Sequence, residues 1–502
     1  FAAVKNGDAM GRSLWRVLVS HRNMLEWQTA AETSKKAQQQ GIVGTCKLLW
    51  SCLLAGALMA ASAFLGHMPI ASLLLAALFF SAPALVLRLD RPRAGESLSP
   101  GAREAVLGWA KRTWQYFETF CTEENGFLPP DNFQEAPLGT AVKNTSPTNI
   151  GMAMLSAVAA HALGLIESSV LLLRLSSMAE RMERAEKWNG HLYNWYSLSP
   201  LTPLAPRYVS TVDSGNLACC LLTAESALAA LKTPEATALG KRLRALAEGM
   251  DFRKLYDEKK KLFHIGFDCV SGTLTKSWYD LMASESRLTS FIAIALHQVD
   301  PEHWQNLSRL LVDAGGGRTL ISWSGTMFEY LMPVLFTGMT EGSLLFESCM
   351  AAVRAQRTAV PAGTPWGISE SGYYAFDRAM YYQYRAFGVH ALALSPARER
   401  ECVISPYSSM LALMAEPRAA VENLVRLETL GALGQYGFYE ALDFTPQRLR
   451  EGVPFEPVKS YMAHHQGMSL CAAANALTGN ALAAHFLCVP EVRAARLPVS
   501  YT

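Results

Sequence analysis

Two long apolar runs constrain this chain more than any other feature of its sequence. Leu48–Leu65 and Pro69–Leu87 contain no charged residue, and only residues 66–68 separate them. At about 1.5 Å per residue, each run is long enough to cross the roughly 30 Å of a bilayer's hydrocarbon core. A buried helical hairpin of a soluble protein is the alternative. We expect residues 44–90 to form two transmembrane helices.

Basic residues on both sides of the two runs indicate their orientation. They are Lys35, Lys36 and Lys47 before the pair, and Arg88, Arg91, Arg93 and Arg103 after it. The connection carries no Lys or Arg, so the positive-inside rule places both ends of the pair, and the long domain that follows, in the cytoplasm. The ten cysteines include no C-x-x-C pair and lie mostly in apolar runs, which indicates free thiols in a reducing compartment.

The flanking regions divide the chain further. Residues 1–43 are polar and helix-prone, and Ser13–Trp27 has apolar residues on one helical face. This amphipathic segment is expected either to lie along the membrane surface or to pack on a neighbouring helix. Residues 91–98 have the composition of a linker. Residues 99–502 are then expected to form one large domain, which is long enough for a substantial core.

Within this domain, long helical patterns alternate with loops rich in Gly, Pro, Asn and aromatic residues. More than a dozen helices are predicted, one of them over residues 377–387. Strand signals are few, and residues 262–269 and 272–276 are expected to form one small hairpin. Many helices with little sheet predict an all-α domain built from helical hairpins arranged in a ring.

The loops carry the chemistry, and Pro365–Phe376 is the most informative. There Glu370 lies between two serines, with Trp366 before it and Tyr373 after it. Aromatic faces stack on pyranose rings, and a carboxylate among them is typical of a site that holds and cuts a sugar chain. A buried glutamate that caps a backbone turn is the alternative.

Further acidic residues lie in comparable loops. They are Asp213, Asp280, Glu285, Glu329, Glu440 and Asp443. Glycoside chemistry needs two carboxyl groups, one protonated and one ionised. In a ring of helical hairpins alternate loops open on the same end, so we expect these groups to converge on one cleft. Asp213 and Asp280 are also good helix N-caps, which is a structural alternative for both.

Several classes of function are excluded. The net charge is only +2, from 45 basic and 43 acidic residues, and no basic stripe is present, so we expect no nucleic-acid partner. Neither a P-loop nor a dinucleotide fingerprint occurs in a strand–helix context. His464 and His465 point about 100° apart on a helix and belong to no H-E-x-x-H motif. We therefore expect no metal and no cofactor.

Long motifs follow one another along nearly the whole chain. They include L-P-P-D-N-F-Q-E at Leu128–Glu135, T-S-P-T-N-I-G at Thr145–Gly151, R-Y-V-S-T-V-D-S-G-N-L at Arg207–Leu217, Y-D-L-M-A-S-E-S-R-L at Tyr279–Leu288, S-W-S-G-T-M-F-E-Y-L-M-P at Ser322–Pro333, W-G-I-S-E-S at Trp366–Ser371, Y-G-F-Y-E-A-L-D at Tyr436–Asp443 and Y-M-A-H-H-Q-G-M-S-L at Tyr461–Leu470. In this order they resemble the central portion of cyclic β-1,2-glucan synthases, which are bacterial membrane enzymes.

The resemblance implies an (α/α)₆ barrel preceded by the membrane hairpin, at the inner membrane of a bacterium. The implied reaction cyclises linear β-1,2-glucan by anomer-retaining transglycosylation. A hydrolase that only cleaves β-1,2-glucan and a non-catalytic glycan-binding module are the alternatives. The implied partners are the glucan, the lipid bilayer, and glycosyltransferase and phosphorylase-like domains of the same longer polypeptide.

The resemblance also implies roles for individual residues. We assign Glu370 as the nucleophile and Glu285 as the acid/base, with Glu440 as an alternative member of the pair. The substrate-binding residues predicted from the same loops are Trp195, Asp213, Tyr279, Asp280, Arg287, Trp323, Glu329, Trp366, Tyr373, Tyr382, Tyr439, His464, His465 and Gln466.

Overall fold

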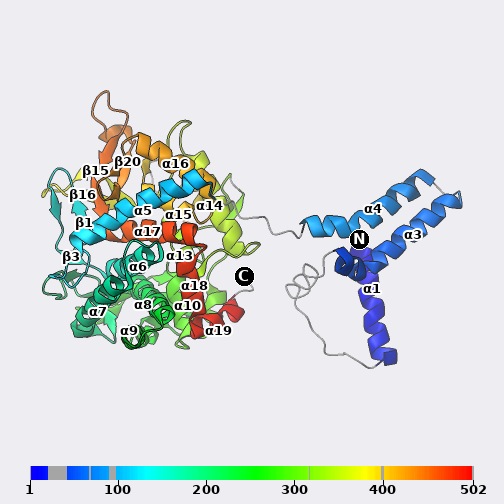
Figure 1. Cartoon of the computed structure of the whole chain (residues 1–502), viewed down its shortest axis with the longest axis horizontal. Coiled ribbons are helices and arrows are strands. Elements are labelled where there is room, and N and C mark those ends of the chain that lie inside the picture. Colours follow the sequence, from blue (N-terminus) through cyan, green and yellow to red (C-terminus); the bar gives the residue numbers. More distant parts are fainter. Residues whose placement is uncertain are drawn as a thin grey trace. The chain divides into compact units, whose positions relative to one another are not determined.

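The computed structural model describes residues 2–20, 42–66, 69–89, 98–315, 317–396 and 401–499. The chain forms two compact units, Phe1–Gly95 and Glu96–Thr502, each described here by itself (Figure 1). The predicted linker at 91–98 lies outside the described residues except for Leu98, as does the part of the predicted amphipathic segment beyond Ser20.

The first unit is built from helices. They are α1 (Ala2–Trp15), the π-helix η1 (Arg16–Ser20), α3 (Trp50–Phe64) and α4 (Pro69–Leu89). Helices α3 and α4 pack closely at Gly56. A Cβ atom built on this glycine would lie only 3.1 Å from the Phe79 Cβ. The Ser62 and Ser72 hydroxyl groups are also 3.0 Å apart across the pair.

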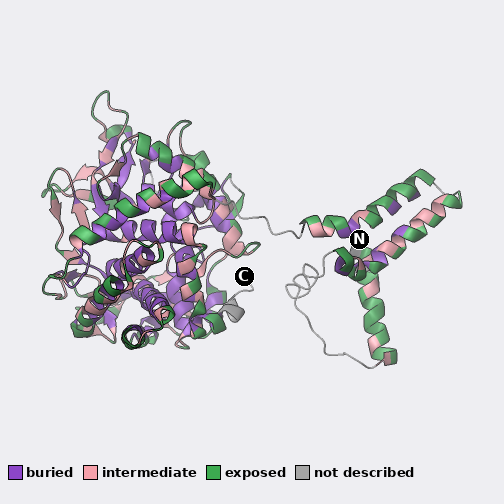
Figure 2. Cartoon of the chain, viewed as in Figure 1, coloured by how far each residue is buried: buried purple, intermediate pink, exposed green. Residues whose placement is uncertain are grey.

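Two helices in the described part of the chain are long and apolar enough to cross a membrane, judged by length and composition. In α4 only 17% of the apolar window is buried, whereas in α8 (Thr211–Leu231) of the second unit 72% is buried. Helix α8 is thus a core helix, whereas most residues of α4 are exposed or half-buried (Figure 2). Helix α3 reaches the required length only with Ile42–Leu48, across a bend of 76°.

The second unit is a ring of helices in two layers. The inner helices are α6 (Pro147–Ala162), α8, α10 (Arg287–Ala295), α12 (Met327–Leu331), α15 (Pro406–Ala412) and α17 (Ala463–Thr478). The longer outer helices are α5 (Pro100–Phe120), α7 (Ser168–Arg184), α9 (Pro234–Glu248), α14 (Leu344–Ala359) and α16 (Pro417–Thr429). Shorter helices complete the unit: α11 (Glu302–Asn306), α13 (Val334–Thr337), α18 (Ala481–Cys488), α19 (Pro490–Val499), η2 (Phe252–Leu255), η3 (His390–Leu392) and η4 (Pro446–Arg448).

Burial distinguishes the two layers. Helices α6, α8 and α17 are buried nearly all round, whereas α7 buries only the stripe that contains Leu171, Leu175 and Met178 (Figure 2). An apolar stripe at helical spacing is what an outer helix needs to cover an inner one. The mostly helical ring agrees with the predicted all-α barrel.

Glycines set the spacing of the inner helices near their N-terminal ends. A Cβ atom at Gly467 of α17 would lie 2.7 Å from Met152 of α6. One at Gly215 of α8 would overlap Thr289 of α10. Because these glycines have no side chain, neighbouring inner helices can approach each other closely. The loops that lead into those helices are therefore brought together.

These loops form more strand than the single predicted hairpin. In the described part of the chain the sheets, in strand order, are β2 (Thr140–Ala141), β1 (Asn132–Gln134) and β22 (Ser460–Met462); β11 (Thr273–Leu274), β10 (Gly266–Asp268) and β7 (Tyr208–Ser210); β12 (Trp278–Tyr279), β9 (Leu262–His264) and β8 (Tyr256–Asp257); β13 (Leu311–Asp313) and β14 (Arg318–Leu320); β15 (Ser371–Phe376) and β16 (Tyr382–Arg385); β17 (Val403–Ile404), β20 (Ala441–Asp443) and β21 (Glu456–Val458); β18 (Leu433–Gly434) and β19 (Gly437–Phe438); β3 (Asn144–Thr145) and β6 (Tyr196–Ser197); and β4 (Lys187–Trp188) and β5 (His191–Leu192). All the pairings are antiparallel.

The prediction of a helix over 377–387 is wrong. This segment turns and returns as β16, which pairs with β15 so that Tyr384 lies opposite Gly372. The Gln134 side chain accepts a hydrogen bond from the Tyr382 N–H at 2.9 Å and donates one to the Met380 carbonyl at 2.7 Å. This long-range amide contact stabilises the turn, which local helical periodicity does not reveal.

Two amide side chains from outer helices hold the loop that ends at Glu370. Gln356 of α14 both accepts from the Ile368 N–H at 2.7 Å and donates to its carbonyl at 2.8 Å. Asn423 of α16 does the same for Trp366, at 3.0 and 2.7 Å. The loop forms one isolated antiparallel bridge, between Ile368 and Ile404 of β17. The two amide side chains satisfy backbone groups of Trp366 and Ile368 that a full strand partner would otherwise bind.

We expect Gln356→Met to destabilise the protein by about 2–4 kcal/mol, because it leaves the buried N–H and C=O of Ile368 unpaired at roughly 1–3 kcal/mol each. Urea unfolding of the full chain in detergent measures this free energy. Gln115→Met, at an exposed position of α5, is the control and should change stability by less than about 0.5 kcal/mol. Equal stability of both variants would contradict the assigned role of Gln356.

Candidate active site

A cavity of about 600 Å³ opens among the loops that enter the inner helices. It is lined by Lys260, Leu262, Ile265, Lys276, Ser277, Trp278, Tyr279, Asp280, Ser284, Glu285, Trp323, Ser324, Thr326, Phe328, Glu329, Glu370 and Ala386. Its size suits a small-molecule or oligosaccharide site. Four carboxyl groups and four large aromatic side chains, from segments far apart in the sequence, thus meet at one place.

Glu285 lies in the turn between β12 and α10, where its side chain lines the cavity. The Ser284 hydroxyl donates to its carboxylate at 3.3 Å. Burial, reinforced by the negative charge of Glu329, raises the pKa of Glu285 to about 7. A carboxyl group with such a pKa holds its proton near neutral pH and can give it to a leaving group.

Glu329 is held in the site by several hydrogen-bond donors. It occupies the third position of α12 in a capping box with Thr326, the helix N-cap. Its carboxylate accepts hydrogen bonds from the Ser322 hydroxyl, the Ser324 N–H and both the N–H and the hydroxyl of Thr326. These donors fix the carboxyl group in place. The charge of Glu329 opposes ionisation of its neighbour Glu285.

Glu370 lines the same cavity. It lies at the end of the loop that Gln356 and Asn423 hold, just before β15. Burial raises the pKa of Glu370, and the nearby charges of Glu285 and Glu329 act in the same direction. The Tyr384 hydroxyl, from the paired strand β16, hydrogen-bonds the carboxylate and opposes that rise. The loop backbone is fixed at this point too, because the Tyr407 hydroxyl donates to the Glu370 carbonyl at 3.0 Å.

Aromatic side chains and an unpaired acid complete the cavity. Tyr279 lines one part of it, and Trp323 is 40% exposed. Asp280 has a buried Oδ1 atom without a hydrogen-bond partner among the described residues. A buried acceptor of this kind is expected to bind a donor such as a sugar hydroxyl. Neither Asp213 nor Asp280 is an N-cap, since Ser210 caps α8 and α10 begins only at Arg287.

A second cavity of about 360 Å³ is lined by Asp131, Asn132, Gln134, Val142, Gly372, Tyr381, Tyr382, Tyr384, Glu440, Ser460 and Met462. Glu440 faces this cavity and not the first. It accepts from the Gly372 N–H at 3.0 Å and contacts His465 Nδ1 at 2.9 Å. Tyr384 connects the cavities, because its ring lines the second and its hydroxyl reaches Glu370 in the first.

Other predicted binding residues lie outside both cavities and have partners within the protein. The Tyr439 hydroxyl donates to Glu135 at 2.7 Å, and the Gln466 amide donates to the Phe438 carbonyl at 2.9 Å. His464 Nδ1 lies 3.1 Å from Asn149 Oδ1. Tyr439, Gln466 and His464 thus support the loops around the cavities.

Four more predicted residues also lie away from the first cavity. Asp213 accepts from the Thr148 hydroxyl at 2.6 Å, and the Tyr373 hydroxyl donates to Gln383 at 2.7 Å. Trp366 is buried, with its backbone bound by Asn423. Trp195 is half-buried in the loop between β5 and β6.

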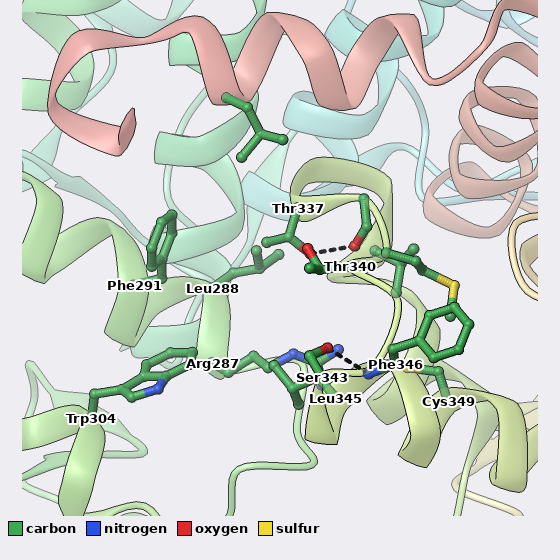
Figure 3. A pocket seen from close by; sticks show the side chains of 14 residues that line it. Arg287, Leu288, Phe291, Trp304, Thr337, Thr340, Ser343, Leu345, Phe346 and Cys349 are labelled. Carbon is green, nitrogen blue, oxygen red and sulfur yellow. Dashed lines mark hydrogen bonds between the residues drawn. The ribbon is translucent and has the colours of Figure 1, made fainter. Parts of the chain in front are cut away.

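Arg287 is buried behind the site. Its guanidinium donates to the carbonyl groups of Ser284, Glu329 and Tyr330, at 3.3, 3.1 and 2.7 Å. Figure 3 shows its side chain in a small apolar pocket with Phe291 and Trp304. Arg287 thereby joins the turn that carries Glu285 to helix α12, which carries Glu329. The sequence motif indicated Arg287 as a candidate binding residue. It did not indicate that the guanidinium donates to backbone carbonyl groups.

The sequence reasoning missed Tyr384 because the segment was predicted to be helical. The available signal was Tyr382, one strand period away, which places Tyr384 on the same face of a strand. Asp131 was also missed, although it lies in the loop Leu128–Gln134, which is polar toward its end. It accepts from Asn149 at 2.8 Å and lines the second cavity.

Comparison with known proteins shows what this chain is similar to. The family model described as "Putative glucoamylase" matches residues 277–483. The chain is 33% identical, over an alignment of 626 residues, to the cyclic β-(1,2)-glucan synthase NdvB of Rhizobium meliloti (strain 1021). That alignment covers 99% of this chain and 22% of NdvB, so the chain spans about a fifth of its curated relative.

Two solved structures share the fold. A "putative glucoamylase" from Bacteroides fragilis NCTC 9343 superposes with a TM-score of 0.66 at 17% identity, covering 82% of this chain and 99% of that one. An endo-β-1,2-glucanase from Chitinophaga pinensis, in complex with sophorotriose and glucose, gives a TM-score of 0.64 at 16% identity, covering 79% and 98%. The resemblance drawn from the motifs is thus confirmed: the chain is similar to a segment of a cyclic β-1,2-glucan synthase, and its second unit has the glycoamylase-like fold.

Proposed function

We propose that this chain acts on linear β-1,2-glucan by a retaining mechanism, with Glu370 as nucleophile and Glu285 as acid/base. The observation that carries the proposal is the pair of half-buried carboxyl groups, both with raised pKa values, that line one aromatic cavity. The similarity to a cyclic β-(1,2)-glucan synthase, and the fold shared with an endo-β-1,2-glucanase, support the choice of substrate.

The first step breaks a glycosidic bond within the glucan. Protonated Glu285 gives its proton to the departing oxygen while ionised Glu370 attacks the anomeric carbon, which forms a glycosyl-enzyme ester. Glu329 assists by keeping the proton on Glu285 beforehand. The Tyr384 hydroxyl assists by hydrogen-bonding the carboxylate form of Glu370.

The second step transfers the bound chain. Glu285, now ionised, takes a proton from a hydroxyl group at the non-reducing end of the same chain, and that oxygen displaces Glu370 from the anomeric carbon. Retention follows because the anomeric carbon is attacked twice. If water replaces the sugar hydroxyl, the same residues give a hydrolase. Incubation with linear β-1,2-glucan and mass spectrometry separates the outcomes, since a cyclic product is lighter by one water than the linear chain of equal length.

We expect Glu370→Gln and Glu285→Gln each to lower turnover at least about 10³-fold, because each removes a group that reacts with the substrate. A glycosyl fluoride, whose leaving group needs no proton, should restore glycosyl-enzyme formation in Glu285→Gln and not in Glu370→Gln. Glu347→Gln, at an exposed position of α14, should retain full activity. Rescue of Glu370→Gln instead would reverse the two assignments.

The raised pKa of Glu285 predicts how stability depends on pH. Its folded-state value of about 7 lies above its ordinary value of 4.5. The contribution to stability is therefore fully present below pH 4.5 and is lost as the pH rises through 7. Glu285→Gln lacks this loss and should be more stable than the wild type at pH 8 by up to about 3 kcal/mol. Thermal unfolding at pH 4.5 and pH 8 tests this, and no difference at pH 8 would contradict burial of a protonated Glu285.

We further propose that the first unit tethers the enzyme to the bacterial inner membrane, with the second unit in the cytoplasm. The chain would then belong to a longer polypeptide with glycosyltransferase and phosphorylase-like domains. The apolar composition of α4 and the 22% coverage of NdvB support this arrangement.

Labelling with a membrane-impermeant maleimide tests the orientation. We expect the exposed Cys488 to react only after the cells are permeabilised, and a cysteine introduced by Gly66→Cys, between the two spans, to react in intact spheroplasts. Reaction of Cys488 in intact spheroplasts would show that the second unit lies outside the cytoplasm.

A further inference from the structure

Four side chains connect the two cavities through consecutive hydrogen bonds. Glu440 contacts His465 Nδ1 with both carboxylate oxygens, at 2.9 and 3.1 Å. On the other side of the imidazole ring, His465 Nε2 lies 3.4 Å from the Tyr384 hydroxyl. That hydroxyl hydrogen-bonds the Glu370 carboxylate. The chain of contacts therefore runs from the carboxyl group of Glu440 to that of Glu370.

His465, in the middle of this series of contacts, is held firmly. His465 is only 1% exposed, and its ring stacks on Tyr407 with centroids 3.7 Å apart and planes 9° from parallel. The Gly372 N–H fixes one oxygen of Glu440 at 3.0 Å. Stacking and hydrogen bonds thus leave the imidazole little freedom to rotate away.

Counting protons allows only two arrangements of the hydrogen bonds among these four side chains. Burial lowers the pKa of His465 well below its ordinary value, so the ring is neutral and carries one N–H proton. If that proton is on Nδ1, it is donated to ionised Glu440, Nε2 accepts from Tyr384, and Glu370 must carry a proton. If it is on Nε2, protonated Glu440 donates to Nδ1, Nε2–H donates to Tyr384, and Tyr384 donates to ionised Glu370. One proton is therefore shared between the two glutamates.

We propose that Glu440, His465 and Tyr384 form a proton relay whose resting state holds the shared proton on Glu440, so that Glu370 is ionised and ready to attack. The inference rests on the proposed role of Glu370 as nucleophile. Moving the proton between the ends needs three concerted transfers: Glu440 to Nδ1, Nε2 to the tyrosine oxygen, and the tyrosine to Glu370. No electrons and no other reactant are involved. The three residues act on Glu370 and are positioning residues.

The charges around Glu370 and Glu440, at the two ends of the relay, explain why the site needs a proton relay. Glu370 faces Glu285, Glu329, Tyr384 and Tyr407. Burial and the two acids raise the pKa of Glu370, which would leave a nucleophile protonated near neutral pH. Glu440 has the Gly372 N–H, His464, His465 and Asp131 as its polar neighbours. Burial raises the pKa of Glu440 as well, so it is able to hold the proton.

The first test measures the pH dependence of turnover in the full chain. Tyr384→Phe removes the donor to Glu370, so kcat should fall about 10- to 100-fold and the acid limb of the profile should move to higher pH. Tyr384 is 42% exposed, so this variant is expected to fold. Tyr374→Phe, on the paired strand and outside both cavities, is the matched control. An unshifted acid limb in Tyr384→Phe would overturn the relay.

Glu440→Gln tests the resting state. Its amide can donate to Nδ1 from the position of Oε2 while its oxygen still accepts from Gly372, which reproduces protonated Glu440. The acid limb of its pH profile should therefore stay where it is in the wild type, because the amide cannot release the proton that it donates to Nδ1. An acid limb that moves to higher pH as far as in Tyr384→Phe would overturn the proposal.

Infrared spectroscopy of the same proteins near neutral pH reads the protons directly and needs no glucan, so it remains informative if the proposed activity fails. Glu440→Gln should lose one protonated-carboxyl band, and Glu370→Gln should lose none. The exposed Glu347→Gln should also lose none. A band that disappears in Glu370→Gln, or that persists unchanged in Glu440→Gln, would overturn the proposal.

Discussion

Close packing of the inner helices at their N-terminal ends is the constraint on which the rest of the structure depends. At Gly467 and Gly215 a helix approaches its neighbour more closely than any side chain would permit. The ring therefore converges where the inner helices begin, and the loops that enter them are forced together. Backbone N–H groups at those ends point toward the same region, which favours negative charge there.

The same convergence creates an electrostatic problem, because several buried or half-buried carboxyl groups lie near one another. The structure gives each a different environment. Glu329 has four hydrogen-bond donors, and Glu285 has one serine and a negative neighbour. Glu370 and Glu440 are joined through a tyrosine and a histidine. Like charges at close range cannot all ionise, so the donors decide which acid keeps its proton.

Much of the fold was predictable from the sequence. Helical periodicity indicated most of the long helices, and the two charge-free runs indicated the hairpin of the first unit. The acids of the cavity were predicted as candidates because Glu285, Glu329 and Glu370 lie in loops with aromatic and small residues. Segment 377–387 was misjudged because its partner strand and the Gln134 amide come from elsewhere in the chain. For Arg287 the residue was identified, but not the backbone carbonyl groups that it binds.

By itself, the sequence determined the helical class of the chain, its apolar hairpin and the set of acidic and aromatic residues available to a site. These properties depend on periodicity and composition, which are local. Only the tertiary structure decided that Glu285, Glu329 and Glu370 share one cavity while Glu440 lies in the next. It also decided that Tyr384 links the two cavities. Protonation depends on burial and on neighbours within a few ångströms, and folding brings those neighbours from segments far apart in the chain.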